Sequence, residues 1–585
     1  MERNAYLINK KIHQYILPSI LMTVAMQLGN VVDGMIVGNL LGAEAMAAIE
    51  ISVPALLLLQ MPAMMLAMGG AAEAAVQLGK RELEKANGAF SASLAAGAAI
   101  SGVFALFAPV LPKPLSYALC GNDALAALAE PYIMVNFAGI PILTIAIIFC
   151  YFMNADNHPQ LGSALFIIAN VVNLALDFIF IKGFHLGMAG SALSTVIGYL
   201  AGMVTVAAYF RSKARMLRLC KLDKNAISYA ALSAKAGIPS AAFTLMSALK
   251  SVIINSAIVR ILGNDPMAVY SVCANAVLIA ELCVGGVIGL VQNIAGILYG
   301  ERDYYGIRVL CKRALAYSYF AIVLLMAFFF AFPQAIAGLF GITSGEMLSL
   351  CKTALRIFAC GFPFYVFNKF LMAYYQTILQ AGLSTVVTVL QGFALIVPLT
   401  LVGIYLWGIY GVCFMAAFSE AASVLFANAW RILGQKKGRY APGGVYMLPK
   451  VSDEKSLDCS VESNLNEVIA FRERLFSFCK QNGISERDAN ILGLAVEELA
   501  ANIVKYGYLD GRKNYMDLNF TIQDDKYMLR IRDDGVPFNP LEYSPKEEGT
   551  VTLGGIALIR KMASNFQYMR VLNMNNTVIE LNINI

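Results

Sequence analysis

Charged residues are scarce in this chain. Asp, Glu, Lys and Arg make up 14% of its 585 residues, 58% are hydrophobic, and the mean hydropathy is +0.65. Soluble domains usually carry about 25% charged residues, so the composition excludes a chain that is soluble throughout. Up to residue ~440 the chain alternates between short polar loops and apolar stretches of about 20 residues, the length that a bilayer-spanning helix needs.

Signatures of several other protein classes are also lacking. The eleven cysteines show no paired spacing, which argues against a disulfide framework or a zinc site. No Gly-x4-Gly-Lys-Ser/Thr loop occurs, so the chain is not an ABC-type motor. The three histidines, His13, His158 and His185, lie in the apolar part and outside any phosphoacceptor context, which argues against a self-contained sensor histidine kinase.

The basic residues that are present gather in alternate loops, for example "GKRELEK", "RSKARMLRLCKLDK" and "RILGQKKGR", and the loops between them are nearly free of Lys and Arg. By the positive-inside rule the basic loops and both termini are cytoplasmic, in a multi-pass protein of the plasma membrane. Because the basic runs alternate with apolar spans, we expect membrane lipid as their surroundings and no nucleic-acid partner.

Twelve membrane spans are predicted, in two related halves. Four matched positions lie 221 residues apart: Ser19 and Ser240, Gly42 and Gly263, Gly79 and Gly300, and Gly187 and Gly408. Each half holds an even number of spans, so the halves are parallel repeats about an axis along the membrane normal, a layout typical of alternating-access transporters. An inert scaffold of duplicated origin is the alternative. The predicted spans cover residues 15–40, 46–72, 88–111, 131–153, 160–182, 188–210, 236–262, 266–297, 310–333, 350–376, 383–404 and 408–431.

The texture of the sequence changes after "GQKKGRYAPGG", where charged residues and ordinary helix and strand periodicities begin. We therefore predict an all-α membrane domain over 1–435, with repeats at about 10–215 and about 230–432. A linker over 436–452 then leads to a soluble α+β domain over 453–585, an ordinary domain size.

The first half carries ionisable residues where a membrane span is expected. Asp33 lies in "VVDGMIVGNLLG", and a carboxylate at that depth costs about 2.5–3.5 kcal/mol by insertion scales. Asn173 and Asp177 lie four residues apart, on one helical face, and Thr195 lies in the following span. These oxygens are the components of a proton relay or a Na⁺ site. The alternative is that both acids are structural or face lipid.

These motifs resemble the multidrug and toxic compound extrusion (MATE) family. The resemblance rests on "VVDGMIVGNLLGAEAMAA", "GGAAEAAVQLGKRELEKA" and "NVVNLALDFIFIKGFHLGMAGSALSTVIG", and it covers roughly residues 10–432. It implies an antiporter in which entry of H⁺ or Na⁺ drives export of an amphipathic, often cationic, organic substrate. It also implies that Asp33, Asn173, Asp177 and Thr195 form the cation site.

The second half departs from some branches of that family. Where they have an acid in the seventh span, this chain has Lys250, and the tenth span carries Asn368 and Lys369. Glu281 is placed to neutralise Lys250 as a buried pair, which would be structural more often than coupling. Lys250, Glu281 and Asn368 are therefore secondary transport candidates. Since lysine disfavours cationic substrates, an anionic or lipid-like substrate remains open.

The soluble domain contains three motifs in a fixed order. "ILGLAVEELAANIVKYGY" is amphipathic and places Glu498 and Asn502 on one helical face. "YMLRIRDDGVPFNP" is an alternating strand that ends in a turn with Asp533 and Gly535, where the backbone can approach a ligand closely. "VTLGGIALIRKM" opens a helix at Gly554 and Gly555, and its free backbone N–H groups favour phosphate.

Together these motifs resemble the GHKL ATP-binding fold of gyrases and histidine kinases, and most closely the anti-sigma-factor serine kinases. The resemblance implies that Glu498 is the general base, that Asn502 holds Mg²⁺ bound with ATP, and that Asp533 and Gly535 receive adenine. Gly554 and Gly555 would pass near the phosphates. Tyr506 stands where the family has histidine, and "LGGIAL" departs from its Gly-x-Gly-Leu motif.

Two functions follow from the sequence. In the first, a cation-coupled antiporter carries an ATP-binding regulatory domain, which is either a serine kinase or a nucleotide sensor. In the second, the membrane part is a sensor, and the soluble domain phosphorylates Ser or Thr on a cytosolic, antagonist-type protein.

Overall fold

The computed structural model describes residues 2–119, 123–340, 342, 345–449, 455–508, 513–523, 525–542 and 555–583. The chain divides into two compact units. The membrane unit is Gln14–Tyr440, and the second unit combines Met1–His13 with Ala441–Ile585. The first thirteen residues thus group with the C-terminal part of the chain.

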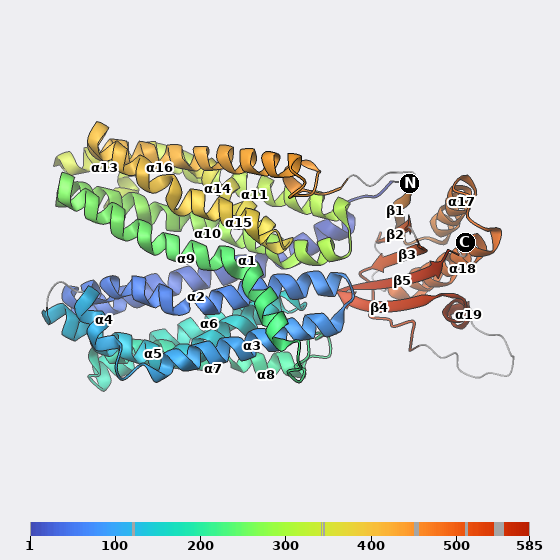
Figure 1. The fold of residues 1–585 in the computed structure, drawn as a ribbon, viewed down its shortest axis with the longest axis horizontal. Helices are drawn as coiled ribbons and strands as arrows, with labels where there is room; N and C mark the ends of the chain where they lie inside the picture. Colours follow the sequence, from blue (N-terminus) through green and yellow to red (C-terminus); the bar gives the residue numbers. More distant parts are fainter. Residues whose placement is uncertain are drawn as a thin grey trace. The chain divides into compact units, whose positions relative to one another are not determined.

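The described residues of the membrane unit form helices and no strand. Figure 1 shows its first half, coloured blue to cyan, and its second half, green to orange, as two helical bundles. The first half contains α1 (Tyr6–Leu41), α2 (Ala43–Gly79), α3 (Leu83–Leu106), α4 (Pro112–Leu119), α5 (Asp123–Ala155), α6 (Pro159–Asp177), the π-helix η1 (Phe178–Gly183), α7 (Gly187–Gly202) and α8 (Val204–Arg211). The second half contains α9 (Ala226–Leu262), α10 (Asn264–Gly300), α11 (Tyr304–Ala331), α12 (Pro333–Leu339), α13 (Gly345–Ala359), α14 (Phe362–Thr377), α15 (Ala381–Val389), the π-helix η2 (Leu390–Ala394) and α16 (Ile396–Lys436).

The backbone confirms the predicted repeat. Helices α2 and α10 begin and end 221 residues apart, at Ala43 and Asn264 and at Gly79 and Gly300. The glycines before them share a left-handed backbone, with φ of 93° at Gly42 and 96° at Gly263. Glycine adopts such a φ without steric penalty, so the matched glycines of the sequence mark matched helix starts.

Close packing joins the two halves at another matched pair. A Cβ on Gly79 would lie 2.1 Å from the Ile297 carbonyl oxygen and 2.9 Å from the Cα of Gly300. Conversely, a Cβ on Gly300 would lie 2.2 Å from the Val76 carbonyl oxygen and 2.8 Å from the Cα of Gly79. Each glycine thus allows the backbone of the other half to approach, and α2 contacts α10 directly.

The helix lengths agree with the predicted spans. In the described part of the chain, nine helices are long and apolar enough to cross a membrane, and a tenth forms if α13 and α14, which meet at 45°, are one bent span. One of the nine, Ala381–Lys436, contains a non-helical break at Trp407 and Gly408. Counting both sides of this break, and α1, gives the twelve spans predicted.

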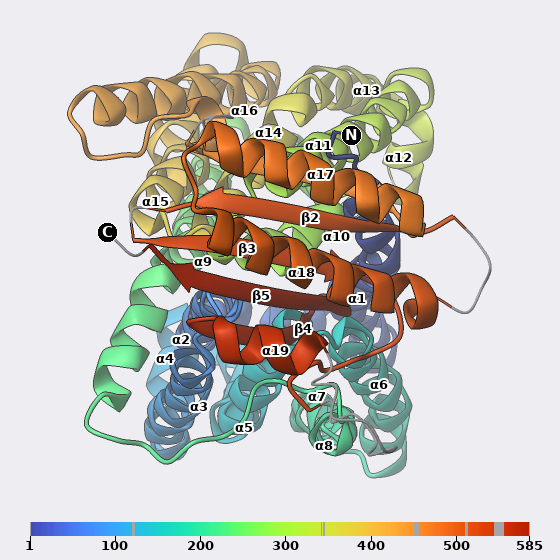
Figure 2. The ribbon, with the colours of Figure 1, turned by 90° about the vertical axis from the view of Figure 1, so that its right-hand side faces the viewer.

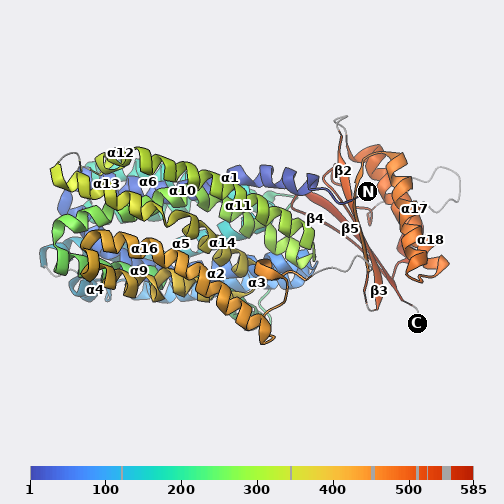
Figure 3. The same ribbon diagram turned by 90° about the horizontal axis from the view of Figure 1, so that it is seen from above.

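The second unit is a layer of helices on an antiparallel sheet, in strand order β1-β2-β3-β5-β4. Figures 2 and 3 show α17, α18 and α19 on one face of this sheet. The elements are the short helix η3 (Gly444–Tyr446), β1 (Ser456–Glu462), α17 (Leu465–Gln481), α18 (Glu486–Asn502), the π-helix η4 (Ile503–Gly507), β2 (Tyr515–Ile522), β3 (Lys526–Asp533), α19 (Gly555–Met562), β4 (Asn565–Val571) and β5 (Met574–Asn582).

The core of this unit lies between the sheet and its helices. Alternate strand residues such as Leu457, Cys459 and Leu518 point into it and meet Phe471 and Val496 of the helices. Because successive side chains of a strand point to opposite faces, the residues between them lie on the other face, which we call the open face. The predicted α+β domain is confirmed.

Candidate cation and nucleotide sites

Three of the four predicted cation-site residues meet in the first half. Asn173 and Asp177, one helical turn apart on α6, are buried, and Asp177 is 0% exposed. The Asn173 Nδ2 donates hydrogen bonds of 3.1 Å to the Ser194 Oγ and the Thr195 Oγ1 of α7. The Ser194 hydroxyl in turn donates to the Asp177 Oδ1. The cluster therefore combines a carboxylate, an amide and two hydroxyls.

Ser194 is a member of this cluster that the sequence analysis did not name. It precedes Thr195 in the quoted "GSALSTVIG", so two adjacent hydroxyls were the available signal. The π-helix η1 begins directly after Asp177, and such bulges are frequent at functional sites. Asp33 lies in α1, but its side chain is outside the described part of the structure.

In the second half the acid expected to pair with Lys250 pairs with another lysine. Glu281 of α10 lies 3.4 Å from the Nζ of Lys369 and accepts a hydrogen bond from the Tyr365 hydroxyl. Tyr365 and Lys369 are one turn apart on α14, so both reach the same carboxylate. The Lys369 ammonium also lies 4.1 Å from the centre of the Phe243 ring. Within the described residues Lys250 forms no ion pair, which corrects the expected Glu281–Lys250 pairing.

A second acid of this half, Glu420 of α16, escaped the sequence analysis. Its carboxylate accepts hydrogen bonds from the Asn368 Nδ2 at 2.8 Å and the Gln391 Nε2 at 3.0 Å. Gln391 belongs to the π-helix η2, so each half places a π-helix beside its polar cluster. Glu420 stands in "FMAAFSEAASVLF", an apolar run with one charge, the same signal that singled out Asp33.

A small cavity separates the two halves, and both contribute polar groups to it. Gln376 of α14 donates to the Ser240 Oγ at 2.7 Å, and Asn293 of α10 donates to the Ser19 Oγ at 3.3 Å. Ser19 and Ser240 are one of the matched pairs of the repeat. The cavity is lined by Met68, Ala71, Ala72, Tyr151, Ala155, Gln292, Asn293, Gln376 and Thr377.

In the second unit Asp533 ends β3 with its carboxylate fixed by neighbours. The Asn575 Nδ2 and the Gly535 backbone N–H each donate to the Asp533 Oδ1 at 2.9 Å. Burial raises the pKa of Asp533 to about 6, although these two hydrogen bonds act in the opposite direction. Asn575 of β5 was not predicted. It lies in "NMNNTVIELN", which offers no motif of its own.

The turn after Asp533 packs against the end of the Glu498 helix. A Cβ on Gly535 would lie 2.4 Å from the Gly507 carbonyl oxygen, and the Val536 N–H donates to that oxygen at 2.8 Å. Gly507 ends η4, which continues α18 beyond Asn502. The predicted need for glycine at position 535 is thus met by a close backbone approach.

The catalytic and phosphate motifs also meet. Glu498 and Asn502 are partly buried on α18. A Cβ on Gly555, the first residue of α19, would lie 2.1 Å from the Glu498 carboxyl carbon. Tyr506 is 70% exposed, and Gly554 lies outside the described residues. A buried carboxyl acceptor, two glycines that let the backbone approach, and a Glu/Asn pair on one helix fit an adenine nucleotide with its metal.

Comparison with known proteins agrees with both parts. The MatE family model matches residues 18–179 and 239–402, two stretches that begin 221 residues apart. The model of the histidine kinase-like ATPase domain matches residues 461–582. The multidrug export protein MepA of Staphylococcus aureus is 24% identical over 430 residues, which cover 72% of this chain and 92% of that protein.

Solved structures share the fold of the membrane unit. One is the outward-facing conformation of a multidrug resistance MATE family transporter, with a TM-score of 0.68 and 19% identity over 76% of this chain and 97% of that one. Another is a transporter from Pyrococcus furiosus, described as having a binding pocket of reverse polarity, with a TM-score of 0.67 and 19% identity over 73% and 97%. The family model covers more than half of the chain, so this protein belongs to the MatE family and carries a histidine kinase-like ATPase domain after its membrane part.

Proposed function

We propose that the membrane unit is an antiporter that couples entry of H⁺ or Na⁺ to export of an amphipathic organic substrate. The observation that carries the proposal is Asp177, a carboxylate with no exposed surface on a membrane helix, hydrogen-bonded to Ser194. A buried acid in a membrane segment is costly and marks ion or proton pathways by default. Asp33, Asn173 and Thr195 complete the proposed cation site.

The cluster can act as a switch through its charge. Asp177 binds a proton directly, or its oxygens and the hydroxyl oxygens of Ser194 and Thr195 bind Na⁺, which prefers hard oxygen ligands. Either cation neutralises the carboxylate and alters the Ser194 hydrogen bond that links α6 to α7. A cation that binds one arrangement of these helices more tightly shifts the equilibrium between the two access states.

The substrate class is proposed from the relatives and from the second half. The MepA relatives are multidrug exporters by name, which favours an amphipathic organic compound. In the second half, Lys250 is near enough to Glu420 to be attracted by it, and Lys369 is held by Glu281. Two lysines in this half, together with the reverse-polarity relative, favour an anionic or lipid-like substrate as the second candidate.

Transport by the purified protein in proteoliposomes tests this proposal. Imposed H⁺ and Na⁺ gradients should reveal which ion drives export of fluorescent amphipathic compounds, both cationic and anionic. Asp177→Asn and Asp33→Asn should abolish gradient-driven export while leaving insertion intact. The control Glu84→Gln, at an exposed helix start, should transport normally. Full transport by Asp177→Asn would refute the cation site.

We propose further that the ATPase-like domain binds ATP with Mg²⁺ and regulates the protein or a partner. The buried Asp533, fixed by Asn575, supports adenine recognition. Asn502 is proposed to hold Mg²⁺ and Glu498 to take the proton from an attacking hydroxyl. ATP would supply the phosphoryl group. A serine or threonine of a cytosolic, antagonist-type protein is the proposed acceptor, and nucleotide sensing without transfer is the alternative.

Titration of the full chain with ATP and Mg²⁺ separates these two roles. Asp533→Ala should abolish saturable binding, and Asn502→Ala should remove its dependence on Mg²⁺. Glu498→Ala should retain binding and lose phosphate release or transfer to protein. If wild-type protein binds ATP but Glu498→Ala changes no turnover, the domain is a sensor. If wild-type protein shows no saturable binding, the nucleotide proposal is wrong.

The orientation of the protein is proposed from its loop charges. Both termini and the ATPase-like domain would lie in the cytoplasm, where ATP is available, and the basic loops would face the anionic lipid of that leaflet.

A further inference from the structure

The first thirteen residues of the chain do not belong to the membrane unit. They group with Ala441–Ile585, and we call residues 2–13 the N-terminal segment. It contains a short extended stretch and the first turns of α1, which continues to Leu41 as one helix and carries Asp33.

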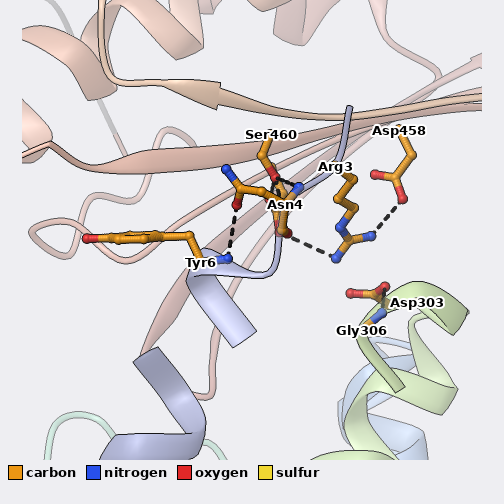
Figure 4. A network of polar contacts seen from close by, with 8 residues as sticks. Arg3, Asn4, Tyr6, Asp303, Gly306, Asp458 and Ser460 are labelled. Atoms are coloured by element: carbon orange, nitrogen blue, oxygen red, sulfur yellow. Dashed lines mark hydrogen bonds and ion pairs between the residues drawn. The ribbon is translucent and has the colours of Figure 1, made fainter. Parts of the chain in front are cut away.

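The segment begins at the edge of the sheet. The Arg3 guanidinium lies 2.8 Å from Asp458 of β1 and 3.4 Å from Asp517 of β2, and the Asn4 N–H donates to the Ser460 Oγ at 3.0 Å (Figure 4). Asp458 and Ser460 alternate with core residues of β1, so they lie on the open face.

The segment then contacts the remaining strands in their spatial order. The Tyr6 ring packs 5.0 Å from the ring of Tyr515 at the start of β2. Lys10 forms an ion pair of 2.6 Å with Asp534, just after β3. Lys11 donates to the Asn573 carbonyl oxygen in the turn between β4 and β5, at 3.3 Å. Successive residues of the segment thus cross the open face from β1 to the last turn.

The Lys10 contact falls on the proposed adenine site. Asp534 directly follows Asp533 and precedes Gly535, and its side chain is only 2% exposed. Its other oxygen receives a hydrogen bond of 3.4 Å from the Tyr508 hydroxyl. One short turn therefore holds the adenine acceptor on one residue and the partner of Lys10 on the next.

We propose that nucleotide binding at Asp533 and docking of the N-terminal segment through Lys10 are thermodynamically linked, so that α1 responds to the nucleotide state. The inference rests on the proposed ATP site. A ligand that fixes the 533–535 turn also fixes Asp534, which strengthens its hold on Lys10. By reciprocity, a docked segment raises the affinity for the nucleotide by the same factor. The partner of the open face is thus the beginning of a membrane helix of the same chain.

Two measurements on the full chain in lipid nanodiscs test the linkage: hydrogen–deuterium exchange of residues 2–13, and the Kd of a fluorescent ATP analogue with Mg²⁺. The test variants are Lys10→Ala and Arg3→Ala, neither of which alters a residue placed in the nucleotide site. The control is Lys80→Ala, which removes an exposed lysine at the end of α2.

In wild-type protein, ATP should slow exchange of the segment. Without ATP, both test variants should exchange faster there, which tests docking by itself. Lys10→Ala should also lose the effect of ATP on exchange and raise the Kd at least about fivefold, the lower end of usual coupling factors, while Lys80→Ala changes neither. ATP binding with an unchanged Kd in Lys10→Ala would overturn the linkage and leave the ATP site standing. No ATP binding by wild-type protein would overturn both.

Discussion

At the scale of single residues, the two units use buried carboxylates differently. Asp177 lies among hydroxyl and amide groups that suit a cation, whereas Asp533 is oriented by Asn575 and Gly535 to accept from a ligand. Both acids were predicted from sequence, because an isolated charge in an apolar run and an Asp-Asp-Gly turn after a strand are local signals.

Their partners were not all predictable. The Lys369 pairing with Glu281 depends on how α14 faces α10, which no local pattern encodes. Asn575 lies 42 residues from Asp533 and reaches it only because β5 pairs with β3. Glu420 is different. It carried the same signal as Asp33 and was missed by inspection, not by physics.

Nucleotide binding should weaken in mild acid. Burial raises the pKa of Asp533 to about 6, and a protonated carboxyl is a poorer acceptor for the adenine amino group. At pH 5 only about a tenth of the sites are ionised, so the apparent Kd should rise about tenfold above its neutral value. Titrations of the full chain between pH 5 and 8 measure this.

Asn575→Ala serves as the matched variant for that titration. It removes a hydrogen bond that lowers the pKa of Asp533, so the midpoint of the pH dependence should move to higher pH. A midpoint that stays in place would assign the acid weakening to the nucleotide phosphates and not to Asp533.

At the scale of elements, apolar length predicted the spans well because lipid demands helices of that length. The π-helices η1 and η2 and the break at Trp407 and Gly408 were not predicted, since each depends on packing within the bundle. The equal spacing of the glycines carried the repeat through to matched helix starts.

The link between α5 and α6 offers an element-scale prediction. Asp156 accepts from the Tyr209 hydroxyl at 2.5 Å and from the backbone N–H groups of Met216 and Leu217, each at 3.0 Å. Asp156→Asn loses a charged acceptor, and each such bond is worth about 1.5–3 kcal/mol. We expect a lower unfolding temperature in detergent, whereas Glu84→Gln should leave it unchanged. Equal melting of both variants would show that Asp156 anchors nothing.

Contact between α2 and α10 gives a second prediction at this scale. Gly79→Ala places a Cβ within 2.1 Å of the Ile297 carbonyl oxygen, and overpacking of this kind costs about 1–3 kcal/mol. Stability in detergent and transport should both fall. Gly102→Ala on α3 is the control, because its Cβ would meet nothing within 4 Å. If the two variants behave alike, the halves do not depend on this contact.

At the scale of the whole molecule, the proposed orientation can be tested with a native thiol. Cys220 is exposed in the basic segment between the two halves. A membrane-impermeant maleimide should label it in inside-out vesicles and not in intact cells, with Cys220→Ser as the baseline. Asp123→Cys in that background, at the start of α5 after a loop without basic residues, should label in the opposite way.

Grouping of Met1–His13 with Ala441–Ile585 has a practical consequence for handling this protein. Its first-made residues must wait, through synthesis of the entire membrane part, for the sheet on which they rest. A purification tag fused ahead of Arg3 would press on that resting place and disturb the ATPase-like domain at the opposite end of the gene. Tags are better inserted in an exposed loop of the membrane part.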